Sequence, residues 1–213
     1  VSMVKIAVPS TLQQSIVHIG ILLVQSVINS FGSTAIAGYS AGMRIESLSI
    51  VPMLAMGNAM STFTAQNMGA GKIDRVKEGY RMCYVIVLTA GAVLCVMYQL
   101  AGGAFVSLFL DSGSSEAYSV GLSYVKFLSF FYSFIGLKAS TDGLLRGAGD
   151  VTAFTVANLV NLAIRVSVTN LFAPIYGIQV AWMAVPLGWA ANYVISFGWY
   201  LTGKWKKVRV IKK

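Results

Sequence analysis

Six long apolar stretches, separated by short polar turns, constrain most strongly what this chain can fold into. A helix that crosses a bilayer needs about 20 mostly apolar residues. The stretches cover 6–30, 34–65, 80–104, 118–145, 151–172 and 177–201, with glycine, serine or proline at each break. With 56% hydrophobic and 11% charged residues, a water-soluble domain could not bury this much apolar surface. The sequence therefore predicts an all-α, polytopic membrane protein, in which 1–213 form a single six-helix transmembrane bundle.

Lysine and arginine gather on one side of the predicted membrane. Thirteen of the 16 lie before the first span, around the second and fourth turns, or after the last span, and the other three turns hold none. This asymmetry predicts an inner-membrane protein with the basic side, and both ends of the chain, in the cytoplasm. Because the net charge of +9 is spread between spans, no nucleic-acid partner is predicted. The chain starts at Val1 without a methionine, and we expect it to be part of a longer protein.

The first span carries a stripe of polar side chains. Thr11, Gln14, His18, Gln25 and Asn29 are spaced by three, four, seven and four residues, so they fall on one helical face. Such a face indicates either the lining of a wet cavity or hydrogen bonds that join neighbouring helices. His18 is the only histidine, and it could relay a proton or simply be hydrogen-bonded.

Four charged residues lie inside the spans and away from the predicted cytoplasmic turns, where charges are costly and usually functional or paired. At ~1.5 Å per residue, Arg44, Glu46, Lys126 and Arg165 all fall in the outer half of the bundle. Lys126 and Arg165 could extend outward to lipid headgroups. Glu46, about 18 Å deep, needs a partner or a proton. A structural ion pair and a role in transport both remain open for it.

The residues for an enzyme are missing. The single histidine and the lack of an HExxH motif leave a metal-dependent hydrolase without its ligands. The glycine turns GAGK and GAGD lack the spacing and the Lys-Ser/Thr ending of a phosphate-binding loop. No enzymatic activity, metal site or cofactor is therefore predicted.

Two short motifs at the predicted cytoplasmic edge point to a family. The second span ends in QNMGAGK (66–72), and the fourth ends in LRGAGD (145–150). With Met43-Arg44-Ile45-Glu46 and a downstream Pro52, they resemble the multidrug and toxic compound extrusion (MATE) family. More narrowly, the whole chain is similar to the carboxy-terminal six-helix lobe of a bacterial member.

The resemblance implies a twelve-helix antiporter built from two six-helix lobes. Such a transporter exports small organic, often cationic, compounds in exchange for H⁺ or Na⁺. The implied partners are membrane lipids and either an amino-terminal lobe or a second copy of the chain. The substrate would bind in a cleft between the lobes. The candidate substrate- and ion-binding residues are Gln14, His18, Gln25, Arg44, Glu46, Asn58, Phe131, Tyr132 and Arg165.

The sequence departs from the family pattern in ways that leave alternatives open. Some members carry acidic cation ligands on the helices that match 6–30 and 118–145. Here the first has none, and the second has only Asp142, close to the predicted turn. A lipid-linked sugar flippase of the same superfamily should bring Arg44, Lys126 and Arg165 into one cavity. A membrane scaffold that transports nothing should be a dry, tightly packed bundle.

Overall fold

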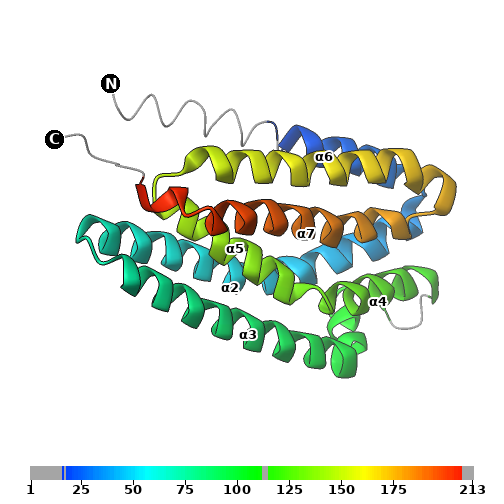
Figure 1. Cartoon of the computed structure of the whole chain (residues 1–213). Helices are drawn as coiled ribbons and strands as arrows, with labels where there is room; N and C mark the ends of the chain where they lie inside the picture. The colour runs from blue at the N-terminus through cyan, green and yellow to red at the C-terminus, as the bar shows by residue number, and fades with distance from the viewer. Residues whose placement is uncertain (1–15, 17, 112–114, 208–213) are drawn as a thin grey trace.

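The computed structural model describes residue 16, residues 18–111 and residues 115–207, which are almost entirely helical (Figure 1). No strand occurs among these residues, so the predicted all-α class is confirmed. A short apolar helix covers His18–Asn29. The other elements are α2 (Ser33–Gly69), α3 (Ile73–Ser107), α4 (Ser115–Ser129), α5 (Tyr132–Gly147), α6 (Val151–Tyr176), α7 (Gln179–Leu201) and the 3₁₀ turn η1 (Lys204–Lys207).

The long helices run side by side along one axis, as in a membrane bundle (Figure 1). Among the described residues, α2, α3, α6 and α7 are each long and apolar enough to cross a bilayer. The pair α4 and α5 passes the same test together, which gives up to five spans. The helix His18–Asn29 lies on the predicted first span, whose earlier residues are outside the described part. A polytopic transmembrane bundle is therefore confirmed.

The span predicted at 118–145 is wrong as a single straight helix, because α4 and α5 meet at a bend of 53°. The cause is a side chain from a remote helix. Gln99 on α3 donates its amide N–H to the carbonyl oxygen of Lys126 and to Ser129 Oγ, each at 2.8 Å. Ser129 Oγ also donates to the Lys126 carbonyl at 2.7 Å. These bonds compete for a carbonyl of the helical ladder, and a kink at such an insertion is expected.

Helix α2 packs closely on α4 and α5 through small residues. A Cβ on Gly57 would lie 2.6 Å from the carbonyl oxygen of Ala139, and one on Gly143 would lie 2.1 Å from that of Gly57. Near the other end of α2, a Cβ on Gly38 would lie 2.4 Å from the carbonyl oxygen of Ala117. Such close backbone approach is how membrane helices associate without a hydrophobic driving force.

The turns alternate between the two ends of the bundle. The α2–α3 turn, the α5–α6 turn and η1 lie at one end (Figure 1). The turns at 30–32, 108–111 and 177–178 lie at the other. Most of the basic residues counted above therefore share one end, as the topology predicted. Lys138 is a correction to that count, because it lies within α5 and its side chain is only 12% exposed.

Candidate functional site

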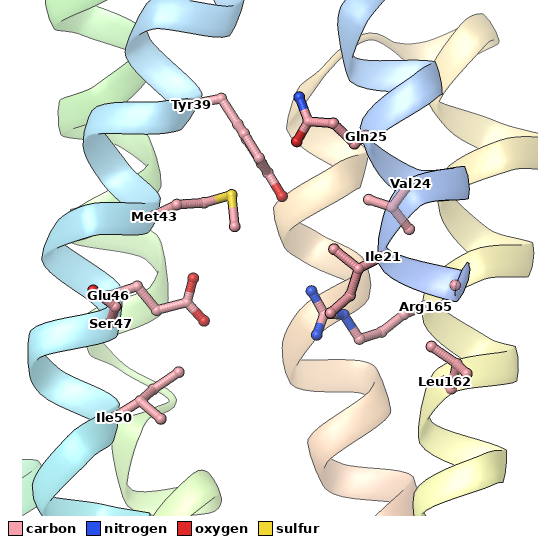
Figure 2. Close-up of a pocket in the computed structure, with 11 residues that line it drawn as sticks. Ile21, Val24, Gln25, Tyr39, Met43, Glu46, Ser47, Ile50, Leu162 and Arg165 are labelled. Atoms are coloured by element: carbon pink, nitrogen blue, oxygen red, sulfur yellow. The ribbon is translucent and has the colours of Figure 1, made fainter. Parts of the chain in front are cut away.

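A pocket of about 190 Å³ opens between the helix His18–Asn29, α2 and α6 (Figure 2). Its wall mixes two charged side chains with polar and apolar ones. The lining residues are Gly20, Ile21, Val24, Gln25, Tyr39, Met43, Glu46, Ser47, Ile50, Leu162 and Arg165. The pocket thus brings together three of the residues selected from the sequence, which come from three separate spans.

Glu46 projects from α2 into this pocket (Figure 2). The residue is only 8% exposed, and Tyr124 on α4 donates its hydroxyl hydrogen to Oε2. Tyr124 can approach α2 so closely because residue 42 is glycine, where a Cβ would lie 2.6 Å from the tyrosine ring. The packing of α4 on α2 therefore fixes the direction in which the carboxyl group points.

Arg165 reaches toward the same space from α6, on the opposite wall (Figure 2). The ion pairs among the described residues do not include one between Arg165 and Glu46. Gly188 on α7 lies against Arg165, since a Cβ there would be 3.0 Å from Arg165 Cγ. The pocket therefore presents a carboxyl group and a guanidinium that face each other without closing into a salt bridge.

Gln25 and Tyr39 form the polar rim of the pocket (Figure 2). Gln25 Nε2 donates to Asn29 Oδ1 at 2.9 Å, along the stripe predicted for the first span. The Tyr39 ring packs edge-on against Tyr124, with centroids 5.3 Å apart. One face of the first span thus supplies a polar side chain to the pocket, while the exposed side chain of His18 is not part of its lining.

The other selected residues that the structure describes lie outside this pocket. Gln14 is outside the described residues. Arg44 is exposed and lines a separate groove near the turn at 108–111, with its guanidinium carbon 6.0 Å from the centre of the Phe109 ring. Asn58 Oδ1 accepts a 2.7 Å hydrogen bond from Arg146, which joins α2 to the end of α5.

The two aromatic residues at the α4–α5 bend also lie away from the charged pocket. Phe131 borders an apolar hollow of about 300 Å³ that also contacts α7. Tyr132 is fully buried, with its ring centroid 5.9 Å from that of Tyr98. These positions make Phe131 a candidate for apolar contact and Tyr132 a core residue.

Sequence reasoning missed three residues that shape the pocket. Tyr39 and Met43 line it, and Tyr124 orients Glu46. Tyr39 and Met43 precede Glu46 by seven and three residues, so they share its helical face. That spacing could have identified both. Tyr124 comes from another span, and no local pattern indicates it.

Comparison with known proteins supplies the family. The MatE family model matches residues 9–171. The probable multidrug resistance protein YpnP of Bacillus subtilis (strain 168) is 28% identical over 97% of this chain and 46% of its own length. Its counterpart YoeA, from the same organism, is 24% identical over 100% of this chain and 46% of its own length. The chain thus spans about half the length of the curated relatives it matches.

Solved structures agree on the fold. A multidrug resistance MATE family transporter of the MOP superfamily, in an outward-facing conformation, superposes with a TM-score of 0.84 at 20% identity. The match covers 95% of this chain and 46% of that one. These homologues and structural neighbours are transporters and not enzymes, as predicted. Because the family model covers most of the chain and the fold agrees, the chain belongs to the MatE family.

Proposed function

We propose that this chain is one lobe of a drug-exporting antiporter of the cytoplasmic membrane, with both termini in the cytoplasm. The observation that carries the proposal is the pocket in which Glu46 and Arg165 face each other without pairing. Secondary transporters bind substrate near the middle of the membrane, between two structural repeats. A chain that spans about half the length of its relatives would supply one wall of such a site.

The chemistry of the pocket suits organic ions with an apolar body. Ile21, Val24 and Met43 offer apolar contact, while Gln25 and the two charged residues offer polar contact. A buried carboxyl group that faces a cavity can exchange a proton with it, so Glu46 is our candidate for ion coupling. We propose H⁺ or Na⁺ as the coupling ion, with alternating access by movement of this lobe against its partner.

The flippase alternative is not favoured, because the three cations that it should bring together, Arg44, Lys126 and Arg165, do not share a cavity. Arg165 lines the charged pocket, and Arg44 lines the separate groove beside Phe109. Lys126 is exposed on α4 and lies near Gly102, where a Cβ would be 3.8 Å from Lys126 Cγ. The pocket, together with the transporters among the relatives, also argues against a scaffold.

Glu46→Gln tests the proposal in membrane vesicles that contain the chain and a partner lobe. The glutamine oxygen can still accept the Tyr124 hydrogen bond, and no ion-paired cation loses its partner. We therefore expect a normal yield of folded protein, with ion-driven efflux of a fluorescent organic cation reduced at least tenfold. Glu78→Gln, an exposed carboxyl group on α3, is the matched control and should leave efflux unchanged. Wild-type efflux by Glu46→Gln, or a parallel loss of efflux and folded protein, contradicts the proposal.

The proposal that this chain is one lobe of a larger transporter can be tested directly. The purified chain, shown to be monomeric, is reconstituted into vesicles with an imposed H⁺ or Na⁺ gradient. We expect no efflux without a partner lobe or a second copy, because alternating access needs two units that move against each other. Robust efflux by the monomer refutes this part of the proposal.

A further inference from the structure

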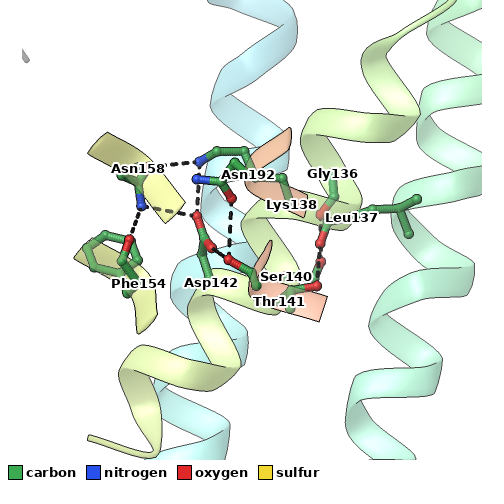
Figure 3. A network of polar contacts seen from close by, with 10 residues as sticks. Gly136, Leu137, Lys138, Ser140, Thr141, Asp142, Phe154, Asn158 and Asn192 are labelled. Atoms are coloured by element: carbon green, nitrogen blue, oxygen red, sulfur yellow. Dashed lines mark hydrogen bonds and ion pairs between the residues drawn. The ribbon is translucent and has the colours of Figure 1, made fainter. Parts of the chain in front are cut away.

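A buried polar network joins α5, α6 and α7 away from the charged pocket (Figure 3). Lys138 Nζ lies 3.0 Å from Asp142 Oδ2 and donates to Asn158 Oδ1 at 3.1 Å. Ser196 Oγ donates to Asp142 Oδ1 at 2.6 Å. The side chains of Lys138 and Asp142 are only 12% and 6% exposed. Charged groups inside membrane spans mark functional sites by default, so this network needs an explanation.

Two oxygens of this network contact the Lys138 ammonium, and the other polar groups hold them in place. Asn158 Nδ2 donates to the carbonyl oxygen of Phe154 at 2.8 Å, which turns the amide oxygen toward Lys138. The single hydroxyl hydrogen of Ser196 has two acceptors, Asp142 Oδ1 at 2.6 Å and Asn192 Oδ1 at 3.4 Å, and the lone pairs of its oxygen can still accept. Asn192, fully buried one helical turn before Ser196, adds an amide whose nitrogen has no partner among the described residues.

Carboxylate, amide and hydroxyl oxygens are the ligands that hard cations take in proteins. Here Asp142 Oδ2 on α5 and Asn158 Oδ1 on α6 contact the Lys138 ammonium (Figure 3). Ser196 on α7 holds the other carboxylate oxygen of Asp142 and lies beside Asn192 Oδ1. We propose that α5, α6 and α7 form a binding site for a monovalent metal cation, and that Lys138 fills this site with its own tethered ammonium. We call this set of residues, Asp142, Asn158, Asn192 and Ser196, the cation cage.

The tethered ammonium has two consequences. Because Lys138 occupies the cation cage permanently, the unmodified chain should not take up Na⁺ or K⁺ there. The charge also holds α6 against α5 and α7, since breaking a buried ion pair by removing one partner strands the other charge. Neither consequence depends on what the chain transports. The inference can therefore be tested independently of the proposed function.

Lys138→Met tests the cation cage, because methionine keeps the unbranched chain and removes only the charged end. The purified variant is melted in detergent with choline chloride, LiCl, NaCl or KCl at equal ionic strength. Choline is too large for the cage, so we expect a reduced melting temperature in that salt. At least one of the small cations should raise the melting temperature by about 5 °C or more, saturably, as a ligand of the folded state does.

Three controls separate the cation cage from a general salt effect. The wild-type chain should melt at the same temperature in all four salts. Lys77→Met should behave likewise, because Lys77 pairs with Asp74 at an exposed site. In Lys138→Met with Asp142→Asn, the cation response should vanish while the protein still folds, since neither charge remains.

The result that overturns the proposal is a Lys138→Met variant that melts alike in every salt, or that fails to fold even with the metal cations present. A wild-type chain with the same cation response as the variant overturns it too, because the ammonium would then not occupy the site.

Discussion

The close approach of α2 and α5 makes Gly143→Ala a sharp test of the fold. A Cβ on residue 143 would lie 2.1 Å from the carbonyl oxygen of Gly57, about 1.3 Å inside the shortest ordinary contact of 3.4 Å. The obstructing atom is helix backbone, which cannot rotate away as a side chain can. One turn later, a Cβ on Gly147 would lie 2.2 Å from the carbonyl oxygen of Ser61. The two helices must therefore separate to admit a single methyl group.

The expected magnitude follows from two opposing effects. Overpacking a well-packed interface costs about 1–3 kcal/mol. Replacing glycine by alanine inside a helix returns about 1 kcal/mol, because the unfolded chain loses backbone freedom. The difference is a loss of roughly 0–2 kcal/mol, and because the obstructing atom is backbone we expect Gly143→Ala to lower the free energy of unfolding by an amount near the upper end, about 2 kcal/mol. Gly198 on α7 has nothing within 4 Å of its Cβ position, so Gly198→Ala isolates the helix effect and should stabilise by up to ~1 kcal/mol.

The assay is reversible unfolding in mixed detergent micelles, followed by circular dichroism as the denaturing detergent fraction rises. Gly143→Ala should unfold at a lower fraction than the wild type, and Gly198→Ala at the same or a higher one. A Gly143→Ala variant as stable as Gly198→Ala would show that the helices do not touch at this point. The position of α5 relative to α2 would then be wrong.

Two further predictions concern the ends of the bundle. Asp150 caps α6 by accepting a hydrogen bond from the Ala153 amide at 3.3 Å, and it accepts another from the Trp199 indole at 2.7 Å. Asp150→Ala should therefore lower the free energy of unfolding by about 1–2 kcal/mol. An unchanged unfolding curve would contradict the cap. The orientation is tested in a variant without native cysteines. Tyr176→Cys should react with an impermeant maleimide on intact cells, and Lys72→Cys should react only after permeabilisation. Labelling of position 72 from outside would show that the predicted orientation is wrong.

The spans could be predicted from the sequence because their signals are local. The stretch 151–172 corresponds to Val151–Tyr176, and 177–201 corresponds to Gln179–Leu201. Hydropathy decides that a segment enters the membrane, and glycine or proline decides where it turns. Both signals are readable within about 20 residues of chain, so the placement of these two spans needs no tertiary information.

The bend, the polar network and the meeting of three helices at the pocket could not be predicted in this way, because their causes come from distant residues. Gln99 on α3 breaks the helical ladder at Lys126, 27 residues away. The sequence placed Lys138 near a cytoplasmic turn, whereas in the structure it is buried beside Asp142 and Asn158. Charge and polarity identified Glu46 and Arg165 as candidates, but only the packing of α2, α4 and α6 shows that they share one cavity.

The two walls of the charged pocket are held in place by different contacts between helices, which we call joints. Glu46 lies on α2, which is clamped to α5 by the backbone contact at Gly57 and Gly143. Arg165 lies on α6, which packs along α7 and is tied to α5 through Asn158 and Lys138. Because α5 takes part in both joints, the separation of the two charged groups is set within the lobe. A shift of α6 alone would therefore have to break the hydrogen bond between Lys138 and Asn158.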